Sequence, residues 1–103
     1  MSMPETGQQE IFRAKLNLET AQMRWREMQR YFASGAALFV SPELDLVEAA
    51  FQMSEDNAAL IEKWMKAGQF GKVTDDQARV WLEADALLWT VVVSPWVLVQ
   101  PVK

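Results

Sequence analysis

The sequence predicts an α+β protein in which about four helices pack on a small sheet of two to three strands, as a single pair of layers. Half of the 103 residues are apolar, which is enough for a packed core. Several segments repeat apolar residues at helical spacing, whereas short valine-rich runs indicate strands. At this length we expect one domain over residues 1–103, with residues 1–7 disordered.

The N-terminal third is predicted to be helical. Apolar residues keep helical spacing from about Gln8 until an irregularity near Gln22. A second stretch then places Trp25, Met28 and Phe32 on one helix face, so we expect these side chains in the core.

A short strand and another helix follow in the prediction. The apolar run at residues 36–40 comes after Gly35, a helix-ending glycine, and its length suits a buried strand. The Ser-Pro-Glu triplet at 41–43 combines an N-cap, a first-turn proline and a carboxylate, which predicts a helix over 42–54. Leucine alternates with aspartate over 44–46, which is typical of a strand, so both structures remain open.

Asp56 is predicted to cap the next helix. Leu60, Trp64 and Ala67 share a face of that helix, and Gly68 ends it.

A loop is expected at residues 69–73, followed by the helix with the strongest start signal. Thr74 and Gln77 have the spacing of a capping box, in which each side chain bonds the backbone N–H of the other residue. The buried stripe behind this cap is predicted to consist of Ala78, Trp81 and Leu82.

The C-terminal segment is dense in β-branched and aromatic residues and predicts strands at Leu88–Val93 and Trp96–Gln100. Pro95 separates them as a bulge or a turn, so the segment is either one bulged strand or a hairpin. Such apolar strands must be covered on both faces, either by the protein's own helices or by a second copy of the chain. The candidate interface residues are Trp89, Val91, Val93, Trp96 and Leu98.

The sequence contains no histidine and no cysteine. Catalytic triads with histidine, thiol nucleophiles, the usual zinc sites, haem ligation and iron–sulfur clusters are therefore excluded. No phosphate-binding glycine motif is present either. We expect a non-enzymatic interaction or self-association module without a cofactor, with a homodimer or an unknown protein as its partner.

The sequence also bears on where the protein works. Its N-terminal residues lack the basic and apolar regions of a secretory signal. The longest apolar run, 86–99, is shorter than the about 20 residues that a membrane span needs. We therefore expect a cytoplasmic protein without membrane contact.

The alternative function is a carboxylate-based metal binder or hydrolase. On a helix over 42–54, Asp45, Glu48, Gln52 and Glu55 would form one stripe, and hard cations take oxygen ligands. A charged stripe is equally the solvated face of any amphipathic helix.

A second alternative is weak nucleic-acid binding through Arg24, Arg26 and Arg30, which alternate with Trp25 and Tyr31. The net charge of −4 disfavours this function.

Four segments of the chain resemble a known family: KLNLETA at 15–21, SPELDLVEAA at 41–50, SEDN at 54–57, and TDDQARVWLEADALLWTVVVSPWVLVQ at 74–100. Together they are similar to a family of small bacterial proteins known as domain of unknown function number 2288. The resemblance implies a bacterial cytoplasmic domain and supplies no activity, cofactor or site residue.

Overall fold

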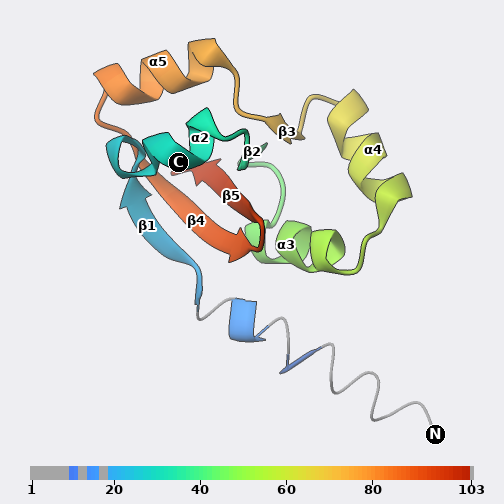
Figure 1. Ribbon diagram of the computed structural model, residues 1–103. Helices are drawn as coiled ribbons and strands as arrows, with labels where there is room; N and C mark the ends of the chain where they lie inside the picture. The colour runs from blue at the N-terminus through green and yellow to red at the C-terminus, as the bar shows by residue number, and fades with distance from the viewer. Residues whose placement is uncertain (1–9, 12–13, 17–18, 103) are drawn as a thin grey trace, which may run out of the picture.

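The computed structural model describes residues 10–11, 14–16 and 19–102 (Figure 1). The strand order across its sheet is β1-β4-β5-β2-β3, with β5 and β2 parallel and the other neighbouring strands antiparallel. The elements in chain order are β1 (Ala21–Arg24), the 3-10 helix η1 (Trp25–Met28), α2 (Gln29–Ala33), β2 (Ala37–Val40), α3 (Leu46–Ser54), α4 (Ala58–Lys66), β3 (Phe70–Lys72), α5 (Asp75–Glu83), β4 (Leu87–Val93) and β5 (Trp96–Pro101). The segment predicted to be disordered, 1–7, lies outside the described residues.

The prediction of two to three strands is wrong, because the protein is α+β with a five-stranded mixed sheet. The prediction misses β1 and β3, which are the two edges of the sheet. β1 has four residues, most of them exposed, and β3 has three residues of which one is buried. Edge strands as short as these give only a weak strand pattern. The sequence therefore predicts helical structure near Gln22, where β1 lies, and a loop at 69–73, where β3 lies.

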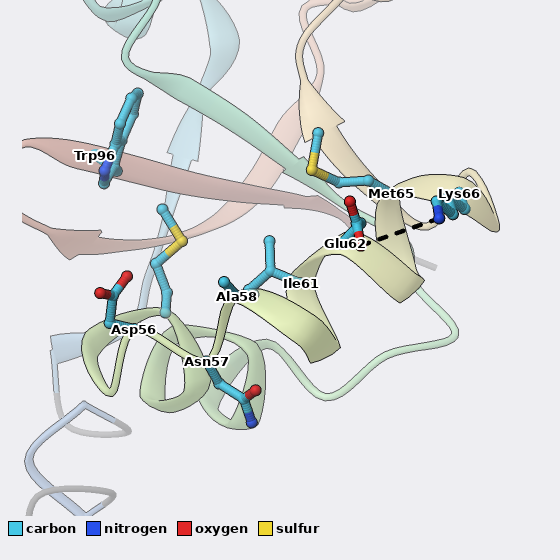
Figure 2. Close-up of a pocket in the computed structure, with 9 residues that line it drawn as sticks. Asp56, Asn57, Ala58, Ile61, Glu62, Met65, Lys66 and Trp96 are labelled. Carbon is cyan, nitrogen blue, oxygen red and sulfur yellow. Dashed lines mark ion pairs between the residues drawn. The ribbon is translucent and has the colours of Figure 1, made fainter.

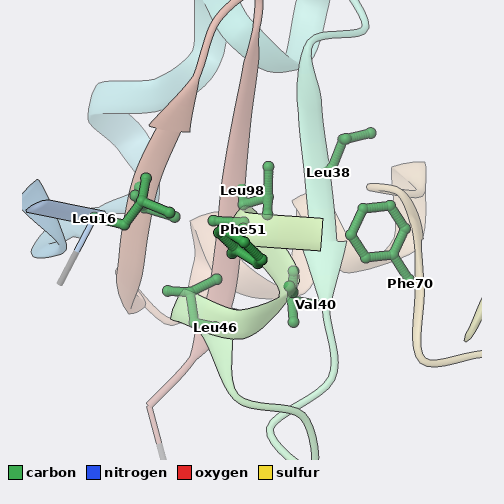
Figure 3. Packing of buried hydrophobic residues seen from close by; sticks show 10 residues of the cluster. Leu16, Leu38, Val40, Leu46, Phe51, Phe70 and Leu98 are labelled. Atoms are coloured by element: carbon green, nitrogen blue, oxygen red, sulfur yellow. The ribbon is translucent and has the colours of Figure 1, made fainter. Parts of the chain in front are cut away.

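Alternation along the strands divides the core into two clusters, one on each face of the sheet. Leu38 of β2 pairs with Leu98 of β5, and both belong to the cluster beneath α3 (Figure 3). Their neighbours Ala37 and Val97 point to the other face and pack with residues of η1 and α5. The sheet is thus the middle one of three layers, and the predicted single pair of layers is also wrong.

The aromatic cluster on the second face was partly foreseen. Trp25 and Met28 are fully buried, as predicted, and Phe32 packs against them half-buried. The Trp25 ring meets Phe32 and Trp81 edge-on, with centroid distances of 5.6 and 5.1 Å. These contacts join η1, α2 and α5. Gly35 follows α2 in the left-handed region, with φ of 78°, as expected for a helix-ending glycine.

Residues 46–54 form the helix α3, so the strand alternative is wrong. The helix begins four residues later than predicted, because its N-cap is Asp45, whose Oδ1 accepts a hydrogen bond from the Glu48 N–H at 3.1 Å. The Ser-Pro-Glu triplet at 41–43 belongs to a turn, closed by the bond from Leu44 N–H to the Ser41 carbonyl.

The next two helices are found close to their predicted positions. α4 is capped by Asn57 rather than by Asp56, and Gly68 follows its end. The capping box of α5 is confirmed, because Thr74 Oγ1 accepts from Gln77 N–H and Gln77 Oε1 accepts from Thr74 N–H. Leu82 is 50% exposed, so its predicted burial is wrong.

The C-terminal strands form a hairpin, with Ser94 and a cis-Pro95 between them. The expectation that both strands are covered on both faces holds for β5, where three consecutive residues after Trp96 are buried. On β4, Trp89 and Val92 are 38% and 58% exposed. In the described part of the chain, no helix combines the length and the apolar character needed to cross a membrane.

Candidate functional site

A groove of about 650 Å³ lies between α3, α4 and the start of β5 (Figure 2). Its volume falls within the range of ligand pockets in proteins. We call it the α4 groove. Its apolar lining consists of Met53, Ala58, Ile61, Met65 and Trp96, and its polar lining of Asp56, Asn57, Glu62 and Lys66.

The turn between α3 and α4 sets the angle of the two helices that wall the groove. Asn57 N–H donates to the Gln52 carbonyl and Asp56 N–H to the Met53 carbonyl, both at 3.1 Å, which is the Schellman pattern of a helix end. Asn57 then caps α4, because its Oδ1 accepts from the Leu60 N–H at 3.3 Å. Bonds on both sides therefore fix this turn.

The α4 wall is held less firmly than the α3 wall. None of the α4 side chains is buried in the described structure, whereas α3 buries Leu46, Ala49, Ala50 and Phe51. Trp64 anchors α4 by packing on Phe70 of β3, with a centroid distance of 6.2 Å. Because methionine side chains are unbranched and flexible, Met53 and Met65 can adjust the shape of the groove lining to a bound group.

The charged side chains of the groove lie toward its two ends (Figure 2). Lys66 and Glu62, in the last two turns of α4, form an exposed ion pair with an N–O distance of 4.0 Å. Asp56 precedes α4 and so lies at the other end, where its exposed carboxylate makes no hydrogen bond or ion pair with any residue that the structure describes.

Among the residues of this groove, Trp96 is predicted as a candidate interface residue and Asp56 only as a helix cap. A usable signal was present, because Ala58, Ile61 and Met65 recur at i, i+3 and i+7. This spacing gives α4 a second apolar face beside the one that carries Trp64. Ile61 packs against the protein's own core beside Trp64, whereas Ala58 and Met65 on this face are exposed.

The predicted carboxylate stripe does not form a cluster. Asp45 caps α3, and Glu48 Oε2 accepts a hydrogen bond from Gln52 Nε2 at 2.7 Å. Glu55 lies at the opposite end of α3 as its C-cap. Across the described ranges, no three acidic, histidine or cysteine side chains are grouped so that they could hold a metal ion.

The predicted interface residues are spread over different environments. Val91 and Leu98 lie in the protein's own core, at 1% and 0% exposure, so a partner cannot reach them. Val93 and Trp96 are half-buried against the same cluster. Trp89 is the most exposed of the five, and it lines two smaller hollows of about 210 and 410 Å³.

The predicted basic patch does not present its aromatic residue. Trp25 is fully buried and cannot stack on a base. Arg24 and Arg26 face Asp85, with N–O distances of 2.9 and 3.7 Å. The Arg30 guanidinium lies 5.0 Å from the ring centre of Tyr31. Arg24 and Arg26 thus contact the end of α5, and Arg30 contacts its neighbour Tyr31 within α2.

Comparison with known proteins agrees with the resemblance seen in the sequence. The profile of a family described as "Protein of unknown function (DUF2288)" matches residues 11–101. The solution NMR structure of PA1075 from Pseudomonas aeruginosa is 43% identical, with a TM-score of 0.80 over 90% of this chain and 86% of that chain. No curated protein matches this chain. Because the family profile spans most of its length, the chain belongs to the DUF2288 family.

Proposed function

We propose that this protein is a non-enzymatic interaction module that binds a partner protein in the α4 groove. The observation that carries the proposal is the convergence of Met53, Met65 and Trp96, from three different elements, on one surface hollow. Tryptophan is enriched where binding energy concentrates, and methionine adapts its shape to different partners. Met65 is 53% exposed, so its side chain is accessible to a partner.

The polar groups of the groove support binding rather than catalysis. Glu62 and Lys66 are paired and exposed to solvent, where neither is shielded from water. Asp56 lies at the other end of α4, a helix of nine residues and thus about 13 Å long. A reacting group could not meet both ends at once.

The proposal is tested by comparing two matched variants in a quantitative capture experiment. Met65→Lys places a charge in the groove, and Val80→Lys places one at an equally exposed apolar position on α5, across the sheet. We expect tagged wild type and Val80→Lys to retain a common set of proteins that Met65→Lys loses. If both variants retain the same set as wild type, the α4 groove is not the binding surface.

A second candidate is self-association through the β1 side of the sheet. β1 is an edge strand, and beside it on β4 the side chains of Leu87 and Trp89 are 39% and 38% exposed on the same face. A second copy could pair along β1 and cover them. Light scattering should then give twice the 11.8 kDa chain mass at tens of micromolar, and Trp89→Gln should restore the monomer. A monomer in both proteins excludes this candidate.

A further inference from the structure

The α3 and α5 helices end in the same unusual way. Helices commonly end with a left-handed glycine, as α2 and α4 do at Gly35 and Gly68. After α3 and α5 that position is taken by Asp56 and Asp85, with φ of 56° and 49°. Glycine would adopt this conformation without steric cost, so the aspartate side chains at these two positions require a reason.

The reason for Asp85 lies within the chain. Its carboxylate binds Arg24 at 2.9 Å and approaches Arg26 at 3.7 Å, which ties the end of α5 to strand β1. The other acidic residue at that helix end, Glu83, is 3.9 Å from Arg79. Every negative charge at the C-terminal end of α5 thus has a cation nearby, which offsets its repulsion by the helix dipole.

The end of α3 carries the same charges without such cations. Glu55 is the C-cap, Asp56 follows it, and the last turn of α3 contains no basic residue. Neither carboxylate forms an ion pair within the described part of the chain. Glu55 lies at the negative end of the α3 dipole, whereas Asp56 directly precedes Asn57, the N-cap of α4, whose positive end favours its charge. Both carboxylates are exposed and without a cation in the described structure, so they offer an ion-pair partner to a bound cation. Asp56 is also the residue of this pair that lines the α4 groove.

We infer that the partner segment bound in the α4 groove is a basic amphipathic helix. One of its lysine or arginine side chains would form an ion pair with the Asp56 carboxylate. This inference rests on the proposed function and specifies its partner. The apolar face of such a helix would cover Met53, Met65 and Trp96, and its cation would meet the carboxylates at the end of α3. Among the charged residues that line the groove, Asp56 and Glu62 outnumber Lys66, which favours a basic partner.

The fold argues for a helix rather than a strand as the bound segment. Trp96 begins β5, which lies between β4 and β2, so no strand edge is open at the groove. A partner must therefore bind through its side chains, as amphipathic helices do in apolar grooves. Most residues that line the groove are exposed, so a small molecule there would keep much of its surface in water, unlike ligands in enclosed pockets.

The test uses two labelled helical peptides that share one apolar face and carry either lysine or glutamate on the polar face. Fluorescence anisotropy should show the lysine peptide binding about tenfold more tightly than the glutamate peptide at low salt. Asp56→Asn keeps a residue that tolerates the left-handed region and removes the charge, and it should abolish most of this preference. Asp76→Asn, which removes a charge from α5 on the other side of the sheet, should leave the preference intact.

The outcomes separate this inference from the proposed function. If both peptides bind equally and Met65→Lys weakens their binding, the groove is supported as the binding surface, but the inference of a basic partner is overturned. A preference that Asp76→Asn reduces as much as Asp56→Asn would reflect general charge and also overturn it. Binding of neither peptide would count against both proposals. Binding of a small cationic amphiphile such as decylamine, with no binding of either peptide, would assign the groove to a small molecule. A dimer of this protein that the peptides dissociate would assign the groove to a second copy of the chain.

Discussion

Met65 on α4 and Trp96 at the first residue of β5 line the same groove, although they lie in distant parts of the chain (Figure 2). The sheet brings them together, because β5 runs beside β2 beneath α3, and the tight turn at Asp56 and Asn57 folds α4 back alongside α3. The groove therefore forms only when α3, α4 and β5 are assembled on one face of the sheet. Its function depends on how firmly each of its walls is held.

The α4 wall should open more readily than the α3 wall. α4 has no buried side chain in the described structure, whereas α3 has four, so local opening of α4 exposes less apolar surface. We expect the backbone amides of 61–66 to exchange with deuterium at least about tenfold faster than those of 50–54. Native-state hydrogen exchange followed by NMR measures this ratio. Equal protection in the two helices would show that they open as one unit.

The Asp56 backbone conformation gives a clear contrast between two substitutions. Asp56→Gly should raise the free energy of unfolding by up to about 1 kcal/mol, because glycine adopts a left-handed conformation freely. Asp56→Ala should lower it by about 1 kcal/mol, since alanine cannot compensate through a short polar side chain. Urea denaturation of the three proteins gives the order. An alanine variant as stable as the glycine variant would contradict the left-handed assignment.

The capping box of α5 should contribute measurably to stability. Thr74→Ala removes the oxygen that accepts from Gln77 N–H and should lower the free energy of unfolding by about 1 kcal/mol. Thr74→Ser keeps a hydroxyl at the same position and is the matched control. Denaturation curves should place the serine variant near wild type. If the serine variant loses as much as the alanine variant, packing of the threonine methyl group, and not the cap, stabilises this end.

Trp25 should stabilise the folded protein through the volume of its side chain and not through its indole N–H. Trp25→Ala removes a fully buried side chain from the second cluster and should cost about 3–5 kcal/mol. The buried Nε1 has no hydrogen-bond partner in the described structure, so Trp25→Phe loses no such bond and should cost less than half as much. Chemical denaturation compares the two. Similar losses for both variants would reveal a polar contact of the indole.

The parts of the fold that depend on residues close together in the sequence could be predicted from local signals. The Thr74 capping box, the Gly35 and Gly68 helix ends and the strand at 37–40 all rest on such signals, and all are present. The hairpin at Pro95 was one of two alternatives. The start of α3 was misplaced because Ser41 and Asp45 are both good N-cap residues, and tertiary contacts decide between them.

The missed features depend on contacts that are distant in the chain. β1 becomes a strand because Ala21–Arg24 pairs with β4. Its four residues do alternate apolar and polar side chains, but so short a pattern does not stand out from the helical spacing around it. β3 is likewise defined by its pairing with β2. Trp96 is predicted as a candidate interface residue, but its companions in the groove come from α3 and α4, and only the assembled fold places them together.

Site-specific photocrosslinking in living cells would show whether the α4 groove is a partner-binding surface. A photoreactive residue would replace Met65 in the groove or Val80 on α5, two apolar positions with nearly equal exposure of 53% and 51%. We expect a discrete crosslinked product with another protein from position 65 and none from position 80. The same products from both positions, or no product from position 65, would contradict this expectation.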